Sequence, residues 1–163
     1  MQTLIFILPE LFLSLTVMFL LMAGVFVKKS YKLINLLTLL SLVFAIILVL
    51  SQPSEIFKVF NESYTIDKLS IYMKVLTLLF CFIVLVSSKD YIKINNIDKI
   101  EYPILILTST LGMMIMISSY DLIVFYLGLE LQSLCLYILA SFKKDDEKST
   151  ESGLKYFILS ALA

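Results

Sequence analysis

Five apolar stretches, each long enough to cross a bilayer, constrain the fold of this chain more than any other feature. A hydrocarbon core of roughly 30 Å needs about 20 helical residues, and inside it the backbone must satisfy its own hydrogen bonds. Hydrophobic residues make up 60% of the chain and charged residues 16%, and the mean hydropathy is +0.98, which excludes a soluble domain. We therefore expect an all-α integral membrane protein, a helical bundle of five full transmembrane helices plus the start of a sixth, forming a single membrane domain over 1–163. The expected spans are about 4–27, 33–50, 69–88, 102–119, 121–142 and 150–163.

The lysines between these spans are distributed unequally over the two sides of the membrane. Alternating spans place nine lysines in the loops of one side and two, Lys58 and Lys68, on the other. Positive charge is enriched on the cytoplasmic or matrix side, so the N-terminus is predicted to face outward. The outer segment 53–68 is too polar to span, and we expect a short helix or a hairpin at the surface. The nine inner lysines are Lys28, Lys29, Lys32, Lys89, Lys93, Lys99, Lys143, Lys144 and Lys148.

Glu130 is the leading candidate for a functional residue. A lone carboxylate near the centre of a spanning helix costs about 2.5–3.5 kcal/mol on insertion scales and usually marks an ion or proton pathway. Tyr126, Ser133 and Tyr137 lie four before, three after and seven after Glu130, which puts all four residues on one helix face, turned toward a partner helix. The functional hypothesis is a proton-carrying carboxyl group with these polar neighbours. The alternative is a hydrogen bond or ion pair that fixes helix packing.

Two lysines inside spans are further candidates. Lys155 lies one turn into the sixth helix, where it is either a proton-carrying group or the partner of Glu151 in a surface i,i+4 pair. Lys74 lies five or six residues from the outer end of the third span, so it either supports the proton pathway or extends to the headgroups. Glu151 also belongs to the polar start expected for the sixth helix near Ser149, and Asp121 is expected to cap the fifth helix.

The chain offers no means to hold a redox centre. It has no histidine, and its two cysteines, Cys81 and Cys135, fall within spans, where they are expected to be small core residues. We therefore expect no cofactor in this chain. Thirteen acids balance thirteen lysines, which gives no indication of a nucleic-acid partner.

Several segments together resemble subunit 2 of respiratory complex I, the antiporter-like subunit called N in bacteria. The most specific are Glu-Leu-x-Ser-Leu-x-Leu-Tyr from Glu130 and Leu-Lys-Tyr-Phe from Leu154, together with the run from Glu101 to Met114. Asp-Lys-Leu-Ser-Ile-Tyr-Met-Lys from Asp67 resembles the entry to the third helix in that family, and Leu-Pro-Glu-Leu-Phe-Leu from Leu8 resembles its start.

The resemblance implies a fold and a function. Family members have fourteen spanning helices in two inverted five-helix repeats, with broken helices that carry half-channels. The family's fifth-helix glutamate corresponds to Glu130 and its sixth-helix lysine to Lys155; the glutamate pairs with a seventh-helix lysine in proton translocation. The implied function is a membrane-arm subunit of proton-translocating NADH:ubiquinone oxidoreductase, with NADH, FMN, Fe–S clusters and ubiquinone bound in other subunits. Together with the absence of Arg, His and Trp, the resemblance predicts a location in the mitochondrial inner membrane. The bacterial plasma membrane is the alternative.

Family members are about three times longer than this chain, so the resemblance covers only their N-terminal portion. We expect partners of three kinds: other complex I membrane subunits, the lipid bilayer, and a second chain that carries the remaining helices. Two alternative functions stay open. One is a subunit of a cation/proton antiporter or membrane-bound hydrogenase, and the other is a non-pumping membrane scaffold.

Overall fold

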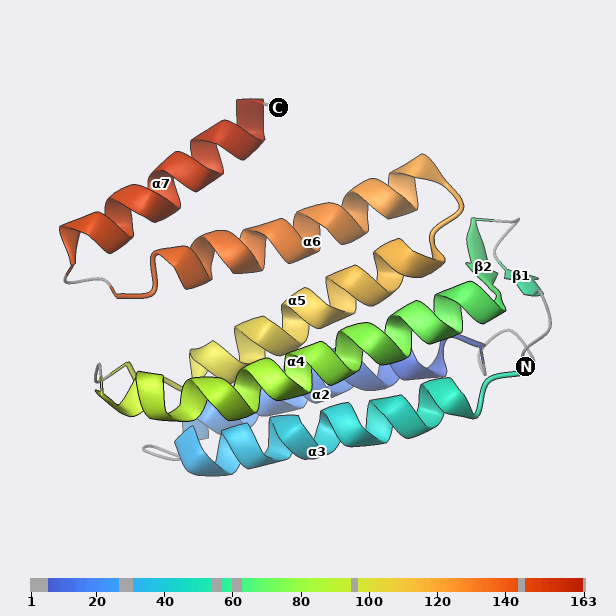
Figure 1. The fold of residues 1–163 in the computed structure, drawn as a ribbon, viewed down its shortest axis with the longest axis horizontal. Coiled ribbons are helices and arrows are strands. Elements are labelled where there is room, and N and C mark those ends of the chain that lie inside the picture. Colours follow the sequence, from blue (N-terminus) through green and yellow to red (C-terminus); the bar gives the residue numbers. More distant parts are fainter. Residues whose placement is uncertain are drawn as a thin grey trace.

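The computed structural model describes residues 6–26, 31–53, 57–59, 63–94, 97–143 and 146–162, and within them it is almost entirely helical (Figure 1). Five helices are long and apolar enough to cross a membrane. The all-α membrane fold with five candidate spans and a shorter sixth helix is therefore confirmed. The helices are α2 (Leu8–Phe26), α3 (Tyr31–Leu50), α4 (Lys68–Ile94), α5 (Glu101–Ser118), α6 (Leu122–Ala140) and α7 (Glu147–Leu162), and the strands are β1 (Phe57–Val59) and β2 (Tyr64–Ile66).

Two helix ends differ from the expected spans. Helix α4 continues to Ile94, beyond the apolar stretch that ends near Ser88, because a helix needs no apolar residues once it has left the hydrocarbon. Helix α7 begins at Glu147 rather than near Ser149. Its first turn is capped by Asp146, whose carboxylate accepts the backbone N–H of Lys148 at 3.1 Å.

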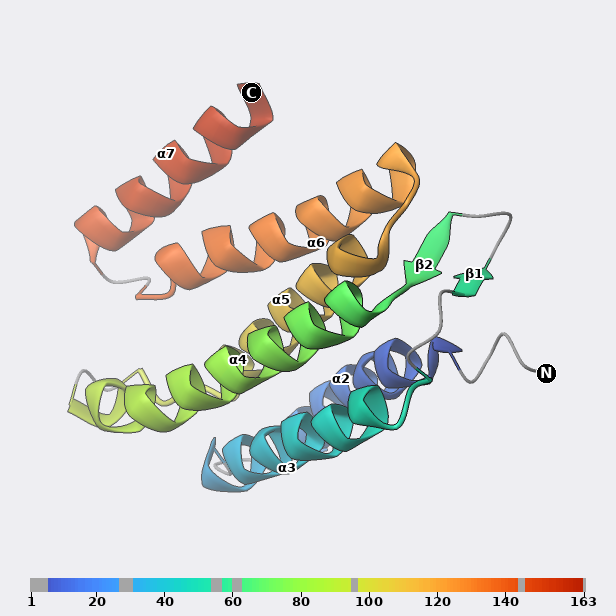
Figure 2. The same ribbon diagram turned by 45° about the vertical axis from the view of Figure 1, so that its right-hand side comes forward.

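Helices α2 to α5 form a four-helix bundle, on which α6 and then α7 are added in sequence order. Each of these four helices contacts two neighbours in a ring, α6 packs chiefly on α5, and α7 chiefly on α6. The views in Figures 1 and 2 agree that α7 diverges from α6 toward the C-terminus. The core of the bundle is aliphatic, and its fully buried members include Leu13, Leu42, Leu78, Leu85, Leu107 and Met114.

Two glycines bring the backbones of α5 and α6 into direct contact. A Cβ atom on Gly112 would lie 2.8 Å from both the Gly128 carbonyl oxygen and the Gln132 backbone nitrogen. A Cβ atom on Gly128 would lie 3.0 Å from the Gly112 carbonyl oxygen. Small residues allow this close approach between membrane helices, whose association depends on packing rather than on the hydrophobic effect. Glu130 is two residues beyond Gly128, so this contact sets its position relative to the bundle.

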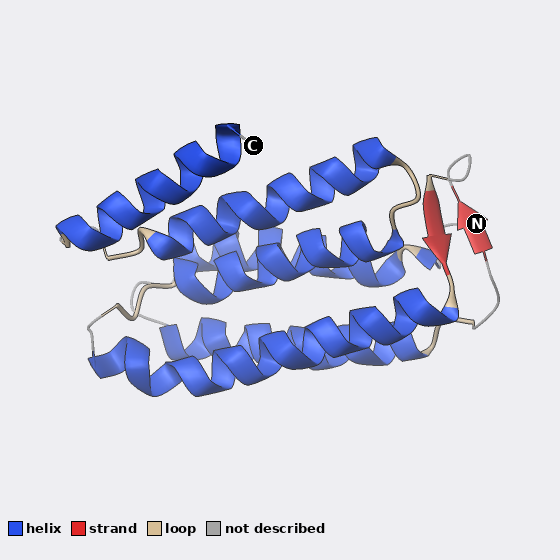
Figure 3. Cartoon of the chain, turned by 45° about the horizontal axis from the view of Figure 1, so that its top comes forward, coloured by secondary structure: helices blue, strands red, loops and turns tan. Residues whose placement is uncertain are grey.

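The polar segment between α3 and α4 forms an antiparallel hairpin of β1 and β2 (Figure 3). This is one of the two forms expected for it. The hairpin is attached to the link between α5 and α6, because Tyr64 forms an isolated bridge with Ser119 and the Tyr120 N–H donates to the Ser63 carbonyl at 3.0 Å. Strand β2 is thereby held at the end of the bundle where α2, α4 and α6 begin (Figure 1).

A reciprocal cap fixes the start of α4 directly after β2. The Ser70 N–H donates to the Asp67 carboxylate at 2.7 Å, and the Asp67 N–H donates to the Ser70 hydroxyl at 2.9 Å. This is the capping-box arrangement, which satisfies two backbone donors at a helix start. Lys74 follows six residues into α4, about 9 Å along the helix axis.

Replacement of Gly128 by leucine is expected to destabilise the α5–α6 contact. Its side chain would meet backbone atoms, which can yield only if the helices separate, so we expect a loss of about 1–3 kcal/mol in the free energy of unfolding. The measurement is SDS-induced unfolding of the full subunit in mixed micelles. The control is Gly24→Ala, whose Cβ atom would meet only the side-chain atoms of Ile100 and Ile34. Equal stability of G128L and the unmodified protein would contradict the backbone contact.

Candidate functional site

A buried ion pair joins α2 to α4 at the hairpin end of the bundle. The Lys74 ammonium is fully buried and lies 2.6 Å from Oε1 of Glu10, which is 5% exposed. Lys74 also donates to the Tyr64 hydroxyl at 2.9 Å, and the Tyr64 hydroxyl donates to the same Glu10 oxygen at 2.6 Å. A carboxylate, an ammonium and a phenol from three different elements thus form a closed triangle of hydrogen bonds.

This geometry corrects one interpretation of Lys74. A lysine near the end of a span was expected either to support the proton pathway or to extend to the headgroups, and the second alternative is wrong. The side chain stays inside the bundle because Glu10 compensates its charge there. The Tyr64 ring, whose centroid lies 5.1 Å from the ammonium, adds a favourable cation–π contact.

Tyr64 acts as a fixed proton donor in this triangle. Burial, followed by the negative charge of Glu10, raises the pKa of the Tyr64 phenol above its ordinary value. The phenol therefore remains protonated at neutral pH and donates to the carboxylate. Its position depends on the hairpin, because β2 carries Tyr64 and the link between α5 and α6 holds β2 in place.

A cavity of about 500 Å³ adjoins the ion pair. It is lined by Glu10 and by Tyr64, with the hydroxyl-bearing residues Ser14 and Ser63 beside them. The second carboxylate oxygen of Glu10, Oε2, is buried and has no hydrogen-bond partner among the described residues. An unpaired buried oxygen in a hollow of this size is ordinarily satisfied by water. The apolar part of the lining consists of Ile7, Leu11, Leu111, Ile115 and Val124.

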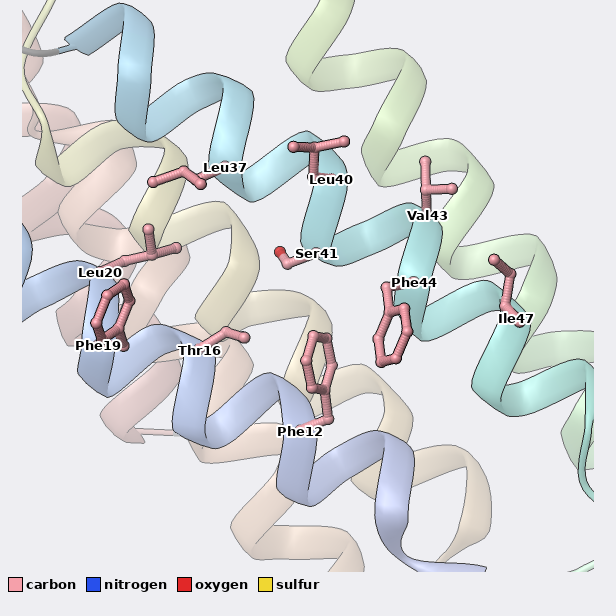
Figure 4. A pocket seen from close by; sticks show the side chains of 10 residues that line it. All are labelled: Phe12, Thr16, Phe19, Leu20, Leu37, Leu40, Ser41, Val43, Phe44 and Ile47. Carbon is pink, nitrogen blue, oxygen red and sulfur yellow. The ribbon is translucent and has the colours of Figure 1, made fainter.

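A second hollow, of about 530 Å³, lies between α2 and α3 and has a different character (Figure 4). Its walls are apolar apart from Thr16 and Ser41. The Thr16 hydroxyl donates to the Leu13 carbonyl and the Ser41 hydroxyl to the Thr38 carbonyl, both at 2.8 Å, so each is satisfied within its own helix. This groove has the chemistry of a lipid-facing surface rather than of a proton site.

Glu130 lies half-buried on α6, with polar groups of its own helix as its neighbours. Tyr126, one turn earlier on α6, interacts with its carboxylate and is 59% exposed. The Ser133 hydroxyl donates to the Glu130 backbone carbonyl at 3.1 Å and so does not reach the carboxylate. Of the four residues expected on one face, only Tyr137 is buried against a partner helix. Its hydroxyl donates a hydrogen bond to the Ser160 hydroxyl of α7.

The contact between α6 and α7 is confined to the end of α6 that is remote from Glu130. The Tyr137 ring packs edge-to-face on Tyr156 and Phe157, and the hydroxyls of Ser149 and Ser152 reach the Ala140 carbonyl. Because α7 diverges beyond this point (Figure 2), the face that carries Glu130 and Tyr126 is not covered by the described part of the chain.

Lys155 forms the exposed pair that its spacing predicted. Its ammonium lies 2.6 Å from the Glu151 carboxylate, and the two side chains are 69% and 63% exposed. Lys155 and Glu130 are therefore not brought together within the described residues.

The two cysteines are buried free thiols on different helices, Cys81 on α4 and Cys135 on α6. The described residues contain no cluster of three or more His, Cys, Asp or Glu side chains that would suit a metal ion. Lys28, Lys29 and Lys144, as well as the Lys58 side chain, fall outside the described structure.

Comparisons with known proteins agree with this architecture. The family model described as NADH:quinone oxidoreductase/Mrp antiporter, TM, matches residues 119–163. NADH-quinone oxidoreductase subunit N of Pelagibacter ubique is 55% identical over 100% of this chain and 35% of its own length. The same subunit of Paramagnetospirillum magneticum is 44% identical over 96% of this chain and 32% of its own length.

A solved structure is also similar to this chain over nearly its whole length. In a structure described as respiratory complex I from Thermus thermophilus with bound aureothin, one chain superimposes with a TM-score of 0.79 at 26% identity. The match covers 94% of the present chain and 33% of that chain. The chain is similar to subunit N along its whole length. It spans about one third of the length of the curated relatives that it matches.

Glu10 and Tyr64 are the site residues that sequence reasoning missed. Glu10 had been noted only as part of the motif that begins at Leu8. The signal was present, since an acid in the first span and a base in the third must both be compensated inside the membrane. Tyr64 had no such signal, because only the hairpin register and its bridge to Ser119 bring it to the pair.

Removal of one member of the buried pair is expected to destabilise the protein strongly. Lys74→Met or Glu10→Gln leaves the other charge buried and uncompensated, a change that typically costs about 3–5 kcal/mol. The double variant removes both charges and should recover much of that loss. The measurement is a double-mutant cycle on the free energy of unfolding of the full subunit in mixed micelles.

The exposed pair on α7 provides the matched control for this cycle. Glu151→Gln and Lys155→Met remove charges of the same kinds at the same separation, and exposed pairs contribute only about 0.2–1 kcal/mol. A coupling energy for Glu10 and Lys74 no larger than that of Glu151 and Lys155 would contradict a buried pair.

Proposed function

We propose that this chain is part of a membrane-arm subunit of proton-translocating NADH:quinone oxidoreductase, the respiratory complex I, and that Glu130 takes part in its proton pathway. The observation that carries the proposal is the match to subunit N along the whole of this chain, at 55% identity in one relative. The complex would be an enzyme, NADH:ubiquinone reductase, to which this chain contributes no redox centre. FMN, Fe–S clusters and the sites for NADH and ubiquinone would lie in other subunits.

The surroundings of Glu130 support the assignment of a proton-carrying role. A half-buried carboxylate in an apolar spanning helix has one interacting polar side chain, Tyr126, and no paired cation within the described residues. Such a group is costly unless a partner or water meets it. A cation on a helix outside this sequence would complete the pair, and a change in its distance would alter the proton affinity of Glu130.

The uncovered faces of α6 and α7 support a larger bundle. Leu122, Ile123 and Leu127 on α6, like Leu159 on α7, expose most of their surface. The relatives are about three times as long as this chain. Helices outside this sequence, on the same polypeptide or on a second one, would cover these faces and bring partners to Glu130 and Lys155. Other membrane subunits of the complex would be the neighbours of that bundle.

Bacterial relatives favour the bacterial plasma membrane over the mitochondrial inner membrane for this multi-pass chain. Lysine counting supports an orientation with the N-terminus outward. The hairpin and the ion pair would then lie near the outer surface.

A second candidate function is transport in a cation/proton antiporter or hydrogenase complex. The family model that matches 119–163 includes the Mrp antiporters, which favours this alternative over a non-pumping scaffold.

Glu130→Gln is expected to abolish proton pumping while the complex still assembles. Gln keeps the size and hydrogen bonding of Glu but cannot ionise, and loss of a positioned proton-transfer group typically lowers a rate on the order of 100-fold or more. The measurement is proton uptake driven by NADH in vesicles that contain the purified complex. The control is Glu147→Gln, in the exposed first turn of α7. Normal pumping in E130Q would leave the scaffold role as the better account.

Helices that cover α6 and α7 are expected to be found by cross-linking within the native particle. A cysteine introduced at Leu159, which is 69% exposed, should cross-link to a helix outside this sequence. Mass spectrometry of the product would identify that helix and show whether it is on the same polypeptide. A cysteine at the buried residue Leu42 is the control. No cross-link from position 159, with lipid as its only neighbour, would contradict the larger bundle.

A further inference from the structure

We propose that Glu10, Lys74 and Tyr64 form a second proton-exchange site, in which Glu10 passes protons to and from water held in the adjoining cavity. The inference rests on the proposed function, because it assigns this group to the same translocation process. It concerns a different set of elements, α2 and α4 with β2, and does not involve Glu130.

The different surroundings of the two Glu10 carboxylate oxygens are the first argument. Oε1 receives both contacts, from Lys74 at 2.6 Å and from Tyr64 at 2.6 Å, while Oε2 is buried and has no partner among the described residues. Glu10 also lines the cavity of about 500 Å³. One oxygen therefore belongs to the protein network, while the other has no protein partner beside a cavity that the Glu10 residue lines. A pair with a purely structural role is more stable when both oxygens are satisfied by protein.

The connected hydrogen bonds provide the second argument, because they allow a proton to move without a change in total charge. Lys74 donates to the Tyr64 oxygen, and Tyr64 donates to Glu10. A proton that passes from the ammonium to the phenol oxygen, while the phenol proton passes to the carboxylate, converts the charged pair into an amine and a carboxylic acid. Tyr64 ends with one proton, as it began. The carboxylic acid then releases its proton to water in the cavity. A proton taken from the same water returns to Lys74 through Glu10 and Tyr64 by the reverse steps, which restores the charged pair.

The surroundings of the site provide the third argument, since the other charged side chains that the structure describes at this end have separate roles. Asp67 accepts the Ser70 N–H at the start of α4, and Asp121 accepts the Ile123 N–H at the start of α6. Lys68 is exposed at the surface. Helix α5 contributes the hydroxyl of Ser118, which faces Tyr64. The described part of α3 contributes no charged side chain at its C-terminal end, which lies here.

The first test is the double variant Glu10→Gln with Lys74→Met in the assembled complex. It leaves no unpaired charge, so a structural role predicts assembly with normal NADH-driven proton uptake. The proposal predicts assembly with proton uptake lowered by about tenfold or more. Normal proton uptake by the double variant would overturn it.

The second test keeps water out of the cavity and leaves Glu10 and Lys74 unchanged. It therefore tests the proposal even if the double variant fails to assemble. Ser14→Phe places a ring in the cavity beside Glu10, whereas Thr16→Phe, on the same helix, places the same ring in the apolar groove of Figure 4. Both native hydroxyls donate only to a carbonyl one turn earlier, so their loss is equivalent. The proposal predicts lower proton uptake in S14F alone. Equal proton uptake in the two variants would overturn it.

Glu130→Gln, measured in the same vesicles, separates this inference from the proposed function. Loss of pumping in E130Q with normal pumping in the double variant and in S14F would retain the proposed function and refute the second site. Normal pumping in all of them would refute both.

Discussion

An ionised side chain inside a bilayer must be paired, hydrated or both, and this constraint organises the whole structure. Glu10 and Lys74 meet it by pairing with each other, which ties α2 to α4 across the bundle. The apolar helices around them have no comparable directional interaction, because lipid solvates aliphatic side chains as well as the core does. The ion pair therefore specifies which helices face each other across the bundle at this end, and close packing determines the neighbours elsewhere.

Glu130 and Lys155 meet the same constraint differently. Neither has a buried counter-ion within the described residues; Glu130 has Tyr126 beside it, and Lys155 has an exposed partner. The charges of Glu10 and Lys74 are thus paired within the bundle. Glu130 and Lys155 lie on faces that the described chain leaves uncovered. The contrast separates the part of the bundle that is complete in itself from the part that requires additional helices.

The sequence was sufficient for the fold because hydropathy and turn-forming residues act locally. The five spans and the Asp121 cap follow from neighbouring residues, whereas the outer segment could be narrowed only to a short helix or a hairpin. The ion-pair site could not be derived in the same way, because its members come from α2, β2 and α4 and meet only after the helices pack. The two alternatives for Lys74 stayed open for that reason, since a lysine near a helix end looks the same in sequence whether or not a carboxylate faces it. The Gly112–Gly128 contact has a weak signal at best, since two isolated glycines do not reveal that they face each other.

The buried pair has a consequence for biosynthesis. Glu10 emerges from the ribosome with the first span, long before Lys74 is synthesised, and Tyr64 lies in the segment between them. During that interval the first span carries a carboxyl group whose counter-ion does not yet exist. The completed triangle needs α4 to face α2 across the bundle. Lateral release of the first helix into lipid is therefore favoured only once the third helix has been made. The first three helices therefore leave the translocon most readily as a group, and their order of synthesis becomes part of how the bundle is assembled.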